Sequence, residues 1–330
     1  MKLKIFAWLV LLALLWGPSF LFVKVIIEEV PPLTLAAARV SLAGGLLYLV
    51  LRSQRQHLPK FGQIWGHFAL TGLMLNALPY ALSSWGAQYI DSALAAILIS
   101  TEPLFVIILA HFYTRDDRLT LNKAIGVLIG FGGASLLFAP ASLAGLQATM
   151  LGLIAVVLTA LSYAVGVVYA KQQLSGLPAL VTPTAQLLTA SVYLLPLALI
   201  AEQPYTLSMP SWPALSSLLA LAVICTALTF VLYFRIMDQA SATHLSLVTY
   251  LVPIVGVLLG VMVLGEQPGW NAYAGCALIL FGVMVVNGLI KVNFHQPDSR
   301  QLEPEPLSLP MSAPGRAPGP PPPTQPATPR

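Results

Sequence analysis

Long apolar stretches separated by short polar connectors run through most of the chain. Each stretch contains about 20 residues, which at a helical rise of about 1.5 Å per residue is enough to cross a hydrocarbon core of roughly 30 Å. Proline, glycine and charged residues gather in the connectors, as they do in turns between helices. We therefore predict an all-α polytopic membrane protein with ten transmembrane helices, at residues 4–25, 32–51, 62–85, 92–113, 121–139, 150–170, 179–200, 212–235, 241–264 and 271–290.

The second half of the chain repeats the pattern of the first. The pair Trp16 and Gly17 recurs as Tyr163 and Ala164, a shift of 147 residues (163 − 16), and Pro103 recurs as Pro253, a shift of 150 (253 − 103). Because each copy holds an odd number of helices, the second copy has to enter the membrane from the opposite side. We expect two inverted five-helix repeats, residues 1–140 and 141–295, an arrangement that many secondary transporters share.

Charged residues are rare and unevenly placed. They make up 8% of the chain, whereas a soluble domain carries about 25%, so a water-soluble fold is excluded. When the N-terminus is placed in the cytoplasm, the lysines and arginines of the connectors fall on the cytoplasmic side, and the positive-inside rule then places both termini there. We expect a multi-pass protein of the bacterial inner membrane, with a disordered, proline-rich cytoplasmic tail at residues 296–330.

Helix-breaking residues interrupt three of the apolar stretches. Gly17 and Pro18, within the motif LLWGPSF, remove a backbone hydrogen bond and predict a bend in the first helix. Pro103 and Pro253 lie near the midpoints of the fourth and ninth helices. Bent or broken backbone at that depth is tolerated where it faces protein or a wet cavity. We predict hinges at these four residues. The alternatives are carbonyl groups freed at Pro103 and Pro253 to bind a ligand, and ordinary helix packing.

Glu102 is the most unusual residue of the apolar stretches, because a carboxyl group near the middle of a bilayer is costly and is usually functional. Desolvation favours the neutral acid, so we predict that Glu102 couples transport to protons or pairs with an amine of the substrate. A structural ion pair with Arg39 is the alternative. Arg39 is itself an intramembrane arginine and is a candidate to bind a substrate carboxylate.

Polar and aromatic side chains near the predicted midplane indicate a binding site for a small molecule. Rings offer flat apolar surfaces, and hydroxyl, amide and indole N–H groups form hydrogen bonds. Simple packing is the alternative for each residue, and Tyr233 adds a further aromatic hydroxyl. The predicted substrate-binding residues are Trp16, Ser19, Arg39, Asn76, Tyr80, Glu102, Tyr163, Thr226 and Tyr250.

No sequence motif for nucleotide or metal chemistry is present. The chain lacks a G-x-x-x-x-G-K-[ST] loop and an H-E-x-x-H motif, and Cys225 and Cys276 do not have the spacing of a metal site or a disulfide framework. We therefore expect no cofactor, no metal and no enzymatic activity, and the net charge of +4 gives no indication of nucleic acid. Gly126 and Gly130 permit close helix packing within the chain, and a homodimer seam is an unsupported alternative.

Several motifs, in their order and spacing, are similar to those of EamA-type transporters in the drug/metabolite transporter superfamily. They include LLWGPSFLFVK (14–24), STEPLF (100–105), LSYAVGVVYAK (161–171) and YLVPIVGVLLGVMVLGEQP (250–268), and the resemblance covers residues 4–290. It implies a ten-helix carrier of small metabolites, with a central cavity lined by helices one to four and six to nine. Family members often carry tryptophan where this chain has Tyr163, so we expect two unequal half-sites, as suits an asymmetric substrate.

We expect a secondary transporter that moves a small metabolite, such as an amino acid, a related metabolite or a drug-like solute, in the direction of export. The expected mechanism is rocking of the two halves around the central site, with protons as the coupling ion and membrane lipid as the surrounding partner. A flippase for a lipid or a lipid-linked sugar is the alternative, and it requires a lateral opening between helices. An intramembrane enzyme is a further alternative, but few polar groups cluster at one depth beyond Glu102 and Arg39. A membrane scaffold is another, and it predicts that Trp16 and Glu102 can be replaced freely.

Overall fold

The computed structural model describes residues 3–113, 119–237, 247–290 and 319 of the chain. By its internal contacts the chain divides into two units, Met1–Val292 and Asn293–Arg330. The helices described below all belong to the first unit. The tail predicted at residues 296–330, apart from Gly319, and the start of the apolar stretch predicted at 241–264 lie outside the described residues.

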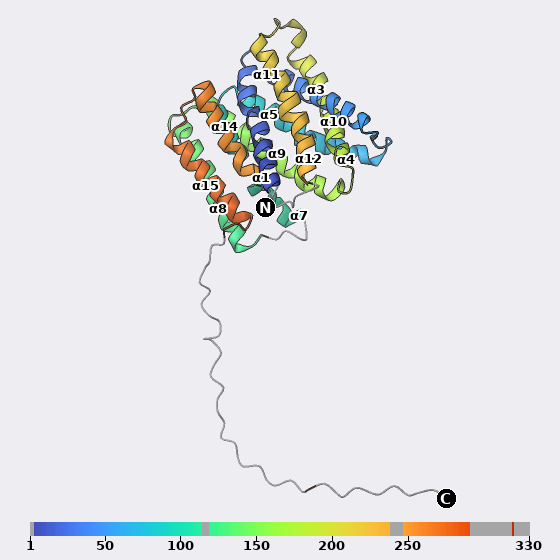
Figure 1. The fold of residues 1–330 in the computed structure, drawn as a ribbon. Helices are drawn as coiled ribbons and strands as arrows, with labels where there is room; N and C mark the ends of the chain where they lie inside the picture. Colours follow the sequence, from blue (N-terminus) through green and yellow to red (C-terminus); the bar gives the residue numbers. More distant parts are fainter. Residues whose placement is uncertain (1–2, 114–118, 238–246, 291–318, 320–330) are drawn as a thin grey trace, which may run out of the picture. The chain divides into compact units, whose positions relative to one another are not determined.

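The described residues form helices joined by short connectors and contain no β-strand. The first half forms α1 (Leu3–Trp16), α2 (Ser19–Ile26), α3 (Pro32–Ser53), α4 (Gln63–Gly72), η1 (Leu73–Ala77), α5 (Leu78–Gly86), α6 (Ser92–Ile99), α7 (Glu102–Tyr113) and α8 (Leu121–Leu143). The second half forms α9 (Gln147–Gln173), α10 (Val181–Ala201), η2 (Pro204–Thr206), α11 (Trp212–Ala222), η3 (Val223–Leu228), α12 (Thr229–Met237), α14 (Val248–Leu264) and α15 (Trp270–Val286) (Figure 1).

Within the described residues, seven helical segments are long and apolar enough to cross a membrane. α14 and α15 are shorter apolar helices, and α4, η1 and α5 together occupy the stretch predicted at 62–85. The all-α, polytopic character predicted from the sequence is therefore confirmed, while the count of ten spans stays a prediction. The seven segments are Ile5–Ile26, Pro32–Ser53, Ser92–Tyr113, Leu121–Leu143, Gln147–Gln173, Val181–Ala201 and Trp212–Tyr233.

Two of the apolar segments are broken near their middles. Gly17 and Pro18 separate α1 from α2, and because Pro18 has no N–H the helix is interrupted at the bend predicted there. Ser100 and Thr101 separate α6 from α7, directly before Pro103. Pro253, in contrast, lies inside the continuous helix α14. The two breaks thus fall in α1–α2 and α6–α7, both in the first half of the chain.

Two π-helical segments lie within longer helices at matching places. η1 separates α4 from α5, and η3 separates α11 from α12. A π-helical turn holds an extra residue, and such turns are rare and gather at functional sites. Asn76 in η1 and Thr226 in η3 are 150 residues apart (226 − 76), the same shift that relates Pro103 to Pro253.

Glycines bring α8 and α15 into backbone contact. A Cβ atom at Gly126 would lie 2.7 Å from the carbonyl oxygen of Gly282, and one at Gly133 would lie 2.7 Å from the carbonyl oxygen of Gly275. Figure 1 shows the two helices side by side. Gly130 of α8 faces Leu104 of α7. The glycines of α8 therefore pack within the chain, as the sequence analysis predicts.

Helices of the first half of the chain pack against helices of the second half. α3 lies along α10, α5 along α9, α6 along α14 and α2 along α11. Gly44 of α3 allows one of these contacts, because a Cβ atom there would lie 3.1 Å from the Cβ of Leu187 in α10. Gly86 allows another, because its Cβ would lie 3.0 Å from the carbonyl oxygen of Gly152. The two halves are thus interlocked along several helix pairs.

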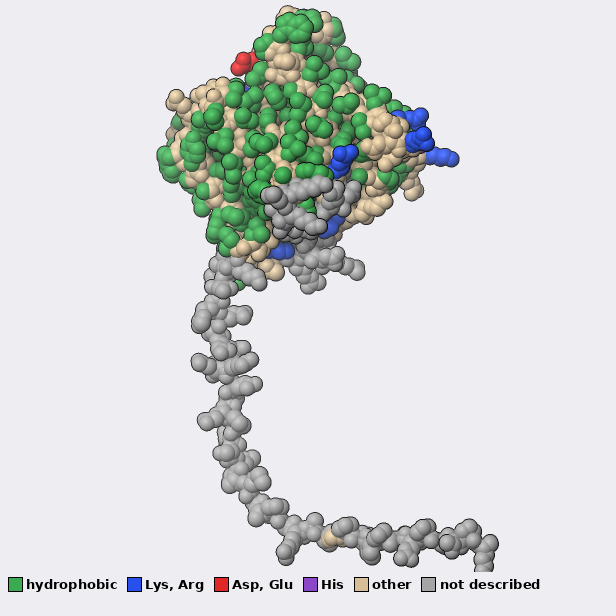
Figure 2. All heavy atoms as spheres, in the orientation of Figure 1, with side chains coloured by type: hydrophobic (Ala, Val, Ile, Leu, Met, Phe, Trp, Pro, Cys, Tyr) green, Lys and Arg blue, Asp and Glu red, His purple; other side chains and the backbone are tan. Residues whose placement is uncertain are grey.

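Hydrophobic side chains cover most of the face drawn in Figure 2. At outward positions, Leu128 of α8, Val192 of α10 and Met262 of α14 are 72%, 70% and 78% exposed. Large apolar side chains exposed on several helices are typical of a surface that faces lipid. The exposed surface therefore agrees with a membrane protein.

Gly282→Ala is expected to destabilise the protein. The added Cβ would lie 2.5 Å from the carbonyl oxygen of Gly126 and 2.7 Å from the backbone nitrogen of Gly130, so α8 and α15 have to move apart. We expect a loss of about 1–3 kcal/mol, measured as a lower melting temperature of the purified protein in detergent. Gly132→Ala is the matched control, because nothing lies within 4 Å of a Cβ atom there. Equal melting temperatures for the two variants would contradict the close packing.

Candidate functional site

A buried arginine joins the two halves of the chain. Arg39 of α3 is 5% exposed, and its Nε–H donates a hydrogen bond to the hydroxyl of Thr226 at 3.0 Å. Its guanidinium carbon lies 3.8 Å from the centre of the Tyr80 ring, on α5. A buried charge requires such partners, and a desolvated cation–π contact contributes about 2 kcal/mol. Arg39 is therefore held in one orientation by a hydroxyl from the second half and a ring from the first.

The π-helical segment η3 positions the hydroxyl that Arg39 binds. The hydroxyl of Thr226 donates a hydrogen bond to the carbonyl oxygen of Leu221 at 2.8 Å, five residues earlier in the chain. This bond leaves the oxygen of Thr226 free to accept from Arg39. The π-helical segment therefore carries the oxygen to which Arg39 donates.

Asn76 occupies the matching position in η1, and its side chain is buried. Its side chain is 1% exposed, and among the described residues neither its amide oxygen nor its amide nitrogen forms a hydrogen bond. An unsatisfied buried polar group costs about 1–3 kcal/mol. A buried amide without a partner indicates a place where a ligand or a water molecule supplies the hydrogen bonds.

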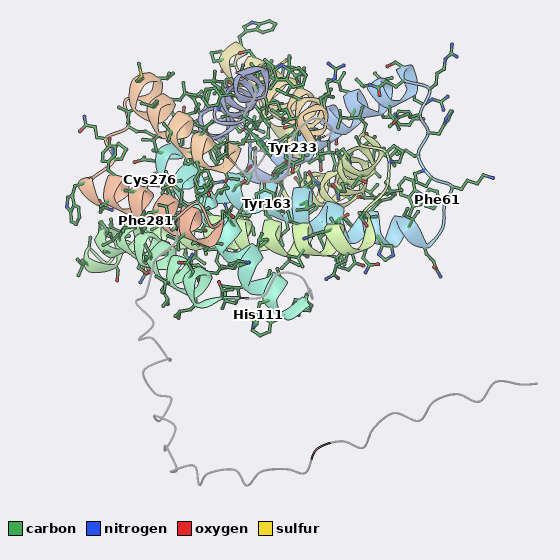
Figure 3. The ribbon with its side chains drawn as sticks, turned by 60° about the horizontal axis from the view of Figure 1, so that its bottom comes forward. Phe61, His111, Tyr163, Tyr233, Cys276 and Phe281 are labelled. Atoms are coloured by element: carbon green, nitrogen blue, oxygen red, sulfur yellow. The ribbon has the colours of Figure 1, made fainter. Side chains whose placement is uncertain are left out.

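Tyr163 lies at the centre of the charged and aromatic side chains. It is on α9, within electrostatic range of Tyr80, Arg39 and Glu102. Tyr233, on α12, is likewise within range of Glu102. In Figure 3, Tyr163 and Tyr233 project to the middle of the helices, whereas Phe61 is drawn at the edge. Residues from α3, α5, α7, α9 and α12 thus meet in one region.

Trp16, at the end of α1, extends this group. Its ring contacts the Tyr233 ring edge-to-face, with the ring centres 6.2 Å apart and the planes at 70°. This is a favourable aromatic geometry. Because Trp16 directly precedes the break at Gly17 and Pro18, the break determines where the indole ring points.

Glu102 begins α7, directly after the turn at Ser100 and Thr101. Its side chain is partly buried, and among the described residues it forms neither a hydrogen bond nor an ion pair. The ion pair between Arg39 and Glu102, the alternative raised by the sequence, is not formed, because Arg39 binds Thr226 and Tyr80 instead. The carboxyl group is thus available to a proton or a substrate.

Of the two remaining predicted residues, Ser19 lies beside the residues around Arg39, and Tyr250 does not. Ser19, the first residue of α2, is buried beside Cys225 of η3, which is within electrostatic range of Arg39. Cys225 was not a predicted site residue, because nothing in its neighbouring sequence distinguishes it from an ordinary apolar position. Tyr250 lies elsewhere, and its hydroxyl accepts a 2.6 Å hydrogen bond from the side-chain amide of Asn287.

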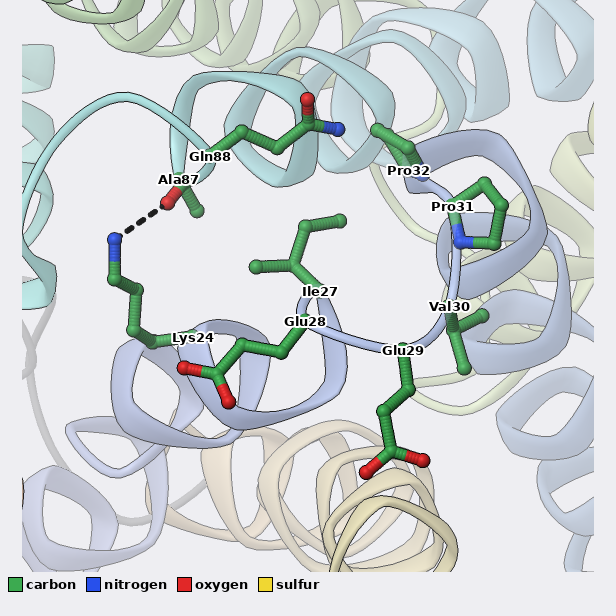
Figure 4. Close-up of a pocket in the computed structure, with 9 residues that line it drawn as sticks. All are labelled: Lys24, Ile27, Glu28, Glu29, Val30, Pro31, Pro32, Ala87 and Gln88. Carbon is green, nitrogen blue, oxygen red and sulfur yellow. Dashed lines mark hydrogen bonds between the residues drawn. The ribbon is translucent and has the colours of Figure 1, made fainter. Parts of the chain in front are cut away.

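A cavity of about 530 Å³ opens near the connector between α2 and α3. Figure 4 shows it between Lys24, Glu28 and Glu29 on one side and Ala87 and Gln88 on the other. The Lys24 ammonium donates 2.9 Å hydrogen bonds to the carbonyl oxygens of Ala87 and Ile90, beyond the end of α5. A cation at a helix C-terminus satisfies carbonyl groups that have no helical partner.

Asp91 is a carboxyl group with an altered pKa at this end of the bundle. Burial raises the pKa of Asp91 above its usual value, the negative charge of Glu266 raises it further, and Lys24 lowers it. Asp91 occupies the N-cap position of α6 but makes no side-chain cap bond. Among the described residues, no three histidine, cysteine or acidic side chains are placed to bind a metal ion.

Comparison with known proteins gives consistent matches along the chain. The profile of the EamA-like transporter family matches residues 3–139 and again residues 150–288. The transporter YoaV of Bacillus subtilis (strain 168) is 26% identical over 286 residues, which cover 86% of this chain and 96% of YoaV. The inner membrane transporter YedA of Escherichia coli (strain K12) is 27% identical over 289 residues, which cover 86% of this chain and 90% of YedA.

A solved crystal structure shares the fold. It superposes with a TM-score of 0.62 at 20% sequence identity, and the match covers 92% of this chain and 100% of the other. At this identity the likeness concerns the fold alone. The chain therefore has relatives over nearly its whole described length.

Thr226→Val is expected to destabilise the protein by about 1–3 kcal/mol, because it leaves the buried Nε–H of Arg39 without an acceptor. Thr226→Ser keeps the hydroxyl and is the matched control. We expect a lower melting temperature for the valine variant than for the serine variant, in the same detergent. If valine is tolerated as well as serine, the hydrogen bond to Arg39 does not hold the group together.

Asp91 is expected to take up a proton at a higher pH than an exposed aspartate, because burial and Glu266 disfavour its charge. Ionised Asp91 therefore costs the folded state stability above its raised pKa, and this cost disappears as the pH falls below the usual pKa of aspartate. The carbon-13 resonance of its carboxyl group, assigned with Asp91→Asn, measures the midpoint. Glu266→Gln should lower the midpoint and Lys24→Met should raise it. A midpoint at or below that of an exposed aspartate contradicts this environment.

Proposed function

Because the chain belongs to the EamA-like transporter family, we propose that it is a secondary transporter that moves a small metabolite across the bacterial inner membrane by alternating access. The inner membrane is proposed from YedA, whose name places that relative there. The exposed apolar surface and the seven apolar segments agree with a multi-pass protein. The sequence has no loop for ATP, so the driving force is a solute or ion gradient.

The proposed architecture has ten helices in two inverted repeats, residues 1–140 and 141–295, with both termini in the cytoplasm. The family profile matches twice, at 3–139 and 150–288, which supports the duplication. The π-segments η1 and η3, whose polar residues are 150 positions apart (226 − 76), support it independently. The lysines and arginines of alternate connectors support the orientation.

The observation that carries the proposal is the buried polar group at the junction of the two halves. Arg39 is held by Thr226 and Tyr80, while the amide of Asn76 has no partner among the described residues. A few convergent polar groups among aromatic rings are typical of small-molecule sites. The proposed substrate-binding residues are Trp16, Ser19, Arg39, Asn76, Tyr80, Glu102, Tyr163 and Thr226, with Tyr250 retained from the sequence at a separate position.

Glu102 is the proposed coupling residue. Its carboxyl group begins a half-helix at a break in the membrane segment, and it forms no ion pair among the described residues. An acid in this position can bind a proton in one state and release it in the other. The breaks at Gly17–Pro18 and before Pro103 are the proposed hinges, with Pro253 as a milder one. The backbone contacts of α8 and α15 keep that pair together during the movement.

The proposed substrate is an amino acid, a related metabolite or a drug-like solute, and the proposed direction is export. Arg39 supplies a cation for an acidic group of the substrate. Glu102 supplies a carboxyl group, and the tyrosines supply aromatic rings and hydroxyl groups. Trp16 and Tyr163 occupy matching positions with unlike side chains, so the two half-sites are unequal. An asymmetric solute with one acidic end fits this arrangement.

Glu102→Gln is expected to abolish the pH dependence of transport, because the amide cannot exchange a proton. Small molecules are measured inside and outside cells that overproduce the wild-type protein or this variant. We expect at least one solute to leave cells with the wild type, and its efflux to change with external pH. In the variant, the efflux should be slow or independent of pH.

The control is Glu28→Gln, which neutralises an exposed acid in the connector after α2 and should transport as the wild type does. If Glu102→Gln keeps both the rate and its pH dependence, the coupling role is wrong. If no solute is redistributed by the wild type, the metabolite-transporter proposal is overturned, and lipids extracted with the purified protein test the flippase alternative.

A further inference from the structure

Two glutamates of the second half cap helices of the first half. Glu202, after α10, accepts hydrogen bonds from the backbone N–H groups of Leu33 and Thr34 at 2.9 and 2.6 Å, in the first turn of α3. Glu266, after α14, accepts one from the backbone N–H of Ser92 at 2.7 Å, in the first turn of α6. A carboxylate at a helix N-terminus satisfies N–H groups that have no helical partner and interacts favourably with the helix dipole.

A third glutamate, in the first half, binds the start of a helix in the second half. Glu29, in the connector between α2 and α3, accepts hydrogen bonds from the backbone N–H and the hydroxyl of Ser211, at the start of α11. The Ser211 hydroxyl and then its backbone N–H hold the pKa of Glu29 below its usual value, so this carboxylate stays ionised at neutral pH. All three carboxylates belong to connectors at one end of the bundle, which is the outer end in the proposed orientation.

The two first-half helices that Glu202 and Glu266 cap lack side-chain caps of their own. α3 follows Pro31, whose side chain has no hydrogen-bonding group, and α6 follows Asp91, which makes no side-chain cap bond. A helix end is ordinarily capped by a residue next to it in sequence. Here the caps come from residues 168 and 174 positions away. These helix ends are therefore satisfied when the two halves are in contact.

A cluster of buried apolar side chains includes neighbours in sequence of Glu29, of the α3 residues that Glu202 binds, and of Thr226 in the central site. Its members come from α2, α3, α11, η3 and the connectors beside them, and Cys225 adjoins Thr226 of the central site. We call this cluster the outer plug. It consists of Val23, Ile26, Val30, Leu35, Ala87, Leu221 and Cys225.

We propose that Glu29, Glu202 and Glu266 form the outer gate of the transport site, and that Asp91 replaces Glu266 as the cap of α6 when this gate opens. The proposal rests on the proposed alternating-access function. Asp91 is already at the N-cap position, and Glu266 holds the N–H of Ala93, one of the two N–H groups that an N-cap carboxylate can bind. The two carboxylates repel each other, and Lys24 is the cation that faces Asp91. The two carboxylates therefore compete for the start of α6, which gives this helix two alternative caps.

The test measures access to Cys225 from outside. The chain has two cysteines, so Cys276→Ser leaves Cys225 as the reporter, and this residue is fully buried at the inner side of the outer plug. Intact cells are treated with the membrane-impermeant thiol reagent sulfonatoethyl methanethiosulfonate. We expect the labelling rate to rise about 2–5-fold for Glu29→Gln, Glu202→Gln or Glu266→Gln, and further when they are combined. Glu28→Gln is the matched control and should label as the parent does.

Asp91→Ala provides the opposite test. In the Glu29→Gln background, removal of the alternative cap should return labelling towards the parent rate, whereas a misfolded protein would label faster. Equal labelling in the parent and in all three glutamine variants overturns the gate, and faster labelling after Asp91→Ala overturns the exchange of caps. Because labelling requires no transported solute, its failure leaves the solute-efflux result of the preceding section intact, and the two proposals are judged separately.

Discussion

A backbone N–H or C=O group that loses its helical partner inside or beside a membrane has to find another partner, and this constraint recurs throughout the structure. At the end of α5, the ammonium of Lys24 binds the carbonyl oxygens of Ala87 and Ile90. At the start of α6, the carboxylate of Glu266 binds N–H groups. Inside η3, the hydroxyl of Thr226 binds the carbonyl oxygen of Leu221. Each polar side chain in these places forms hydrogen bonds to backbone groups.

The same constraint explains why the polar group sits where the halves meet. Arg39 of the first half is oriented by Thr226 of the second, and that hydroxyl is itself fixed by its own π-turn. The glycine contacts between α3 and α10, and between α5 and α9, bring the backbones of the two halves close together. Packing along the helices thus creates the geometry on which the polar contacts depend.

The sequence predicts what local chemistry determines and misses what distant partners determine. The break at Gly17 and Pro18 is visible because proline lacks an N–H wherever it stands. The π-segments are not visible, because LMLNA and VICTAL contain no helix breaker. Glu202 and Glu266 resembled ordinary connector residues, since the N–H groups they bind lie 168 to 174 positions away. For the same reason the sequence offered Glu102 as the partner of Arg39, while the folded chain supplies Thr226.

The backbone contact between α8 and α15 provides a reference point for measuring the movement of other helices. At Gly126, Gly133, Gly275 and Gly282 the backbones of the two helices touch directly, with no side chain between them that could slide or repack. The pair therefore forms a stationary frame within the chain. Tyr273 is 52% exposed on α15, so a spectroscopic probe attached there would remain on that frame. A change in its distance to a second probe on another helix would then report the displacement of that helix alone.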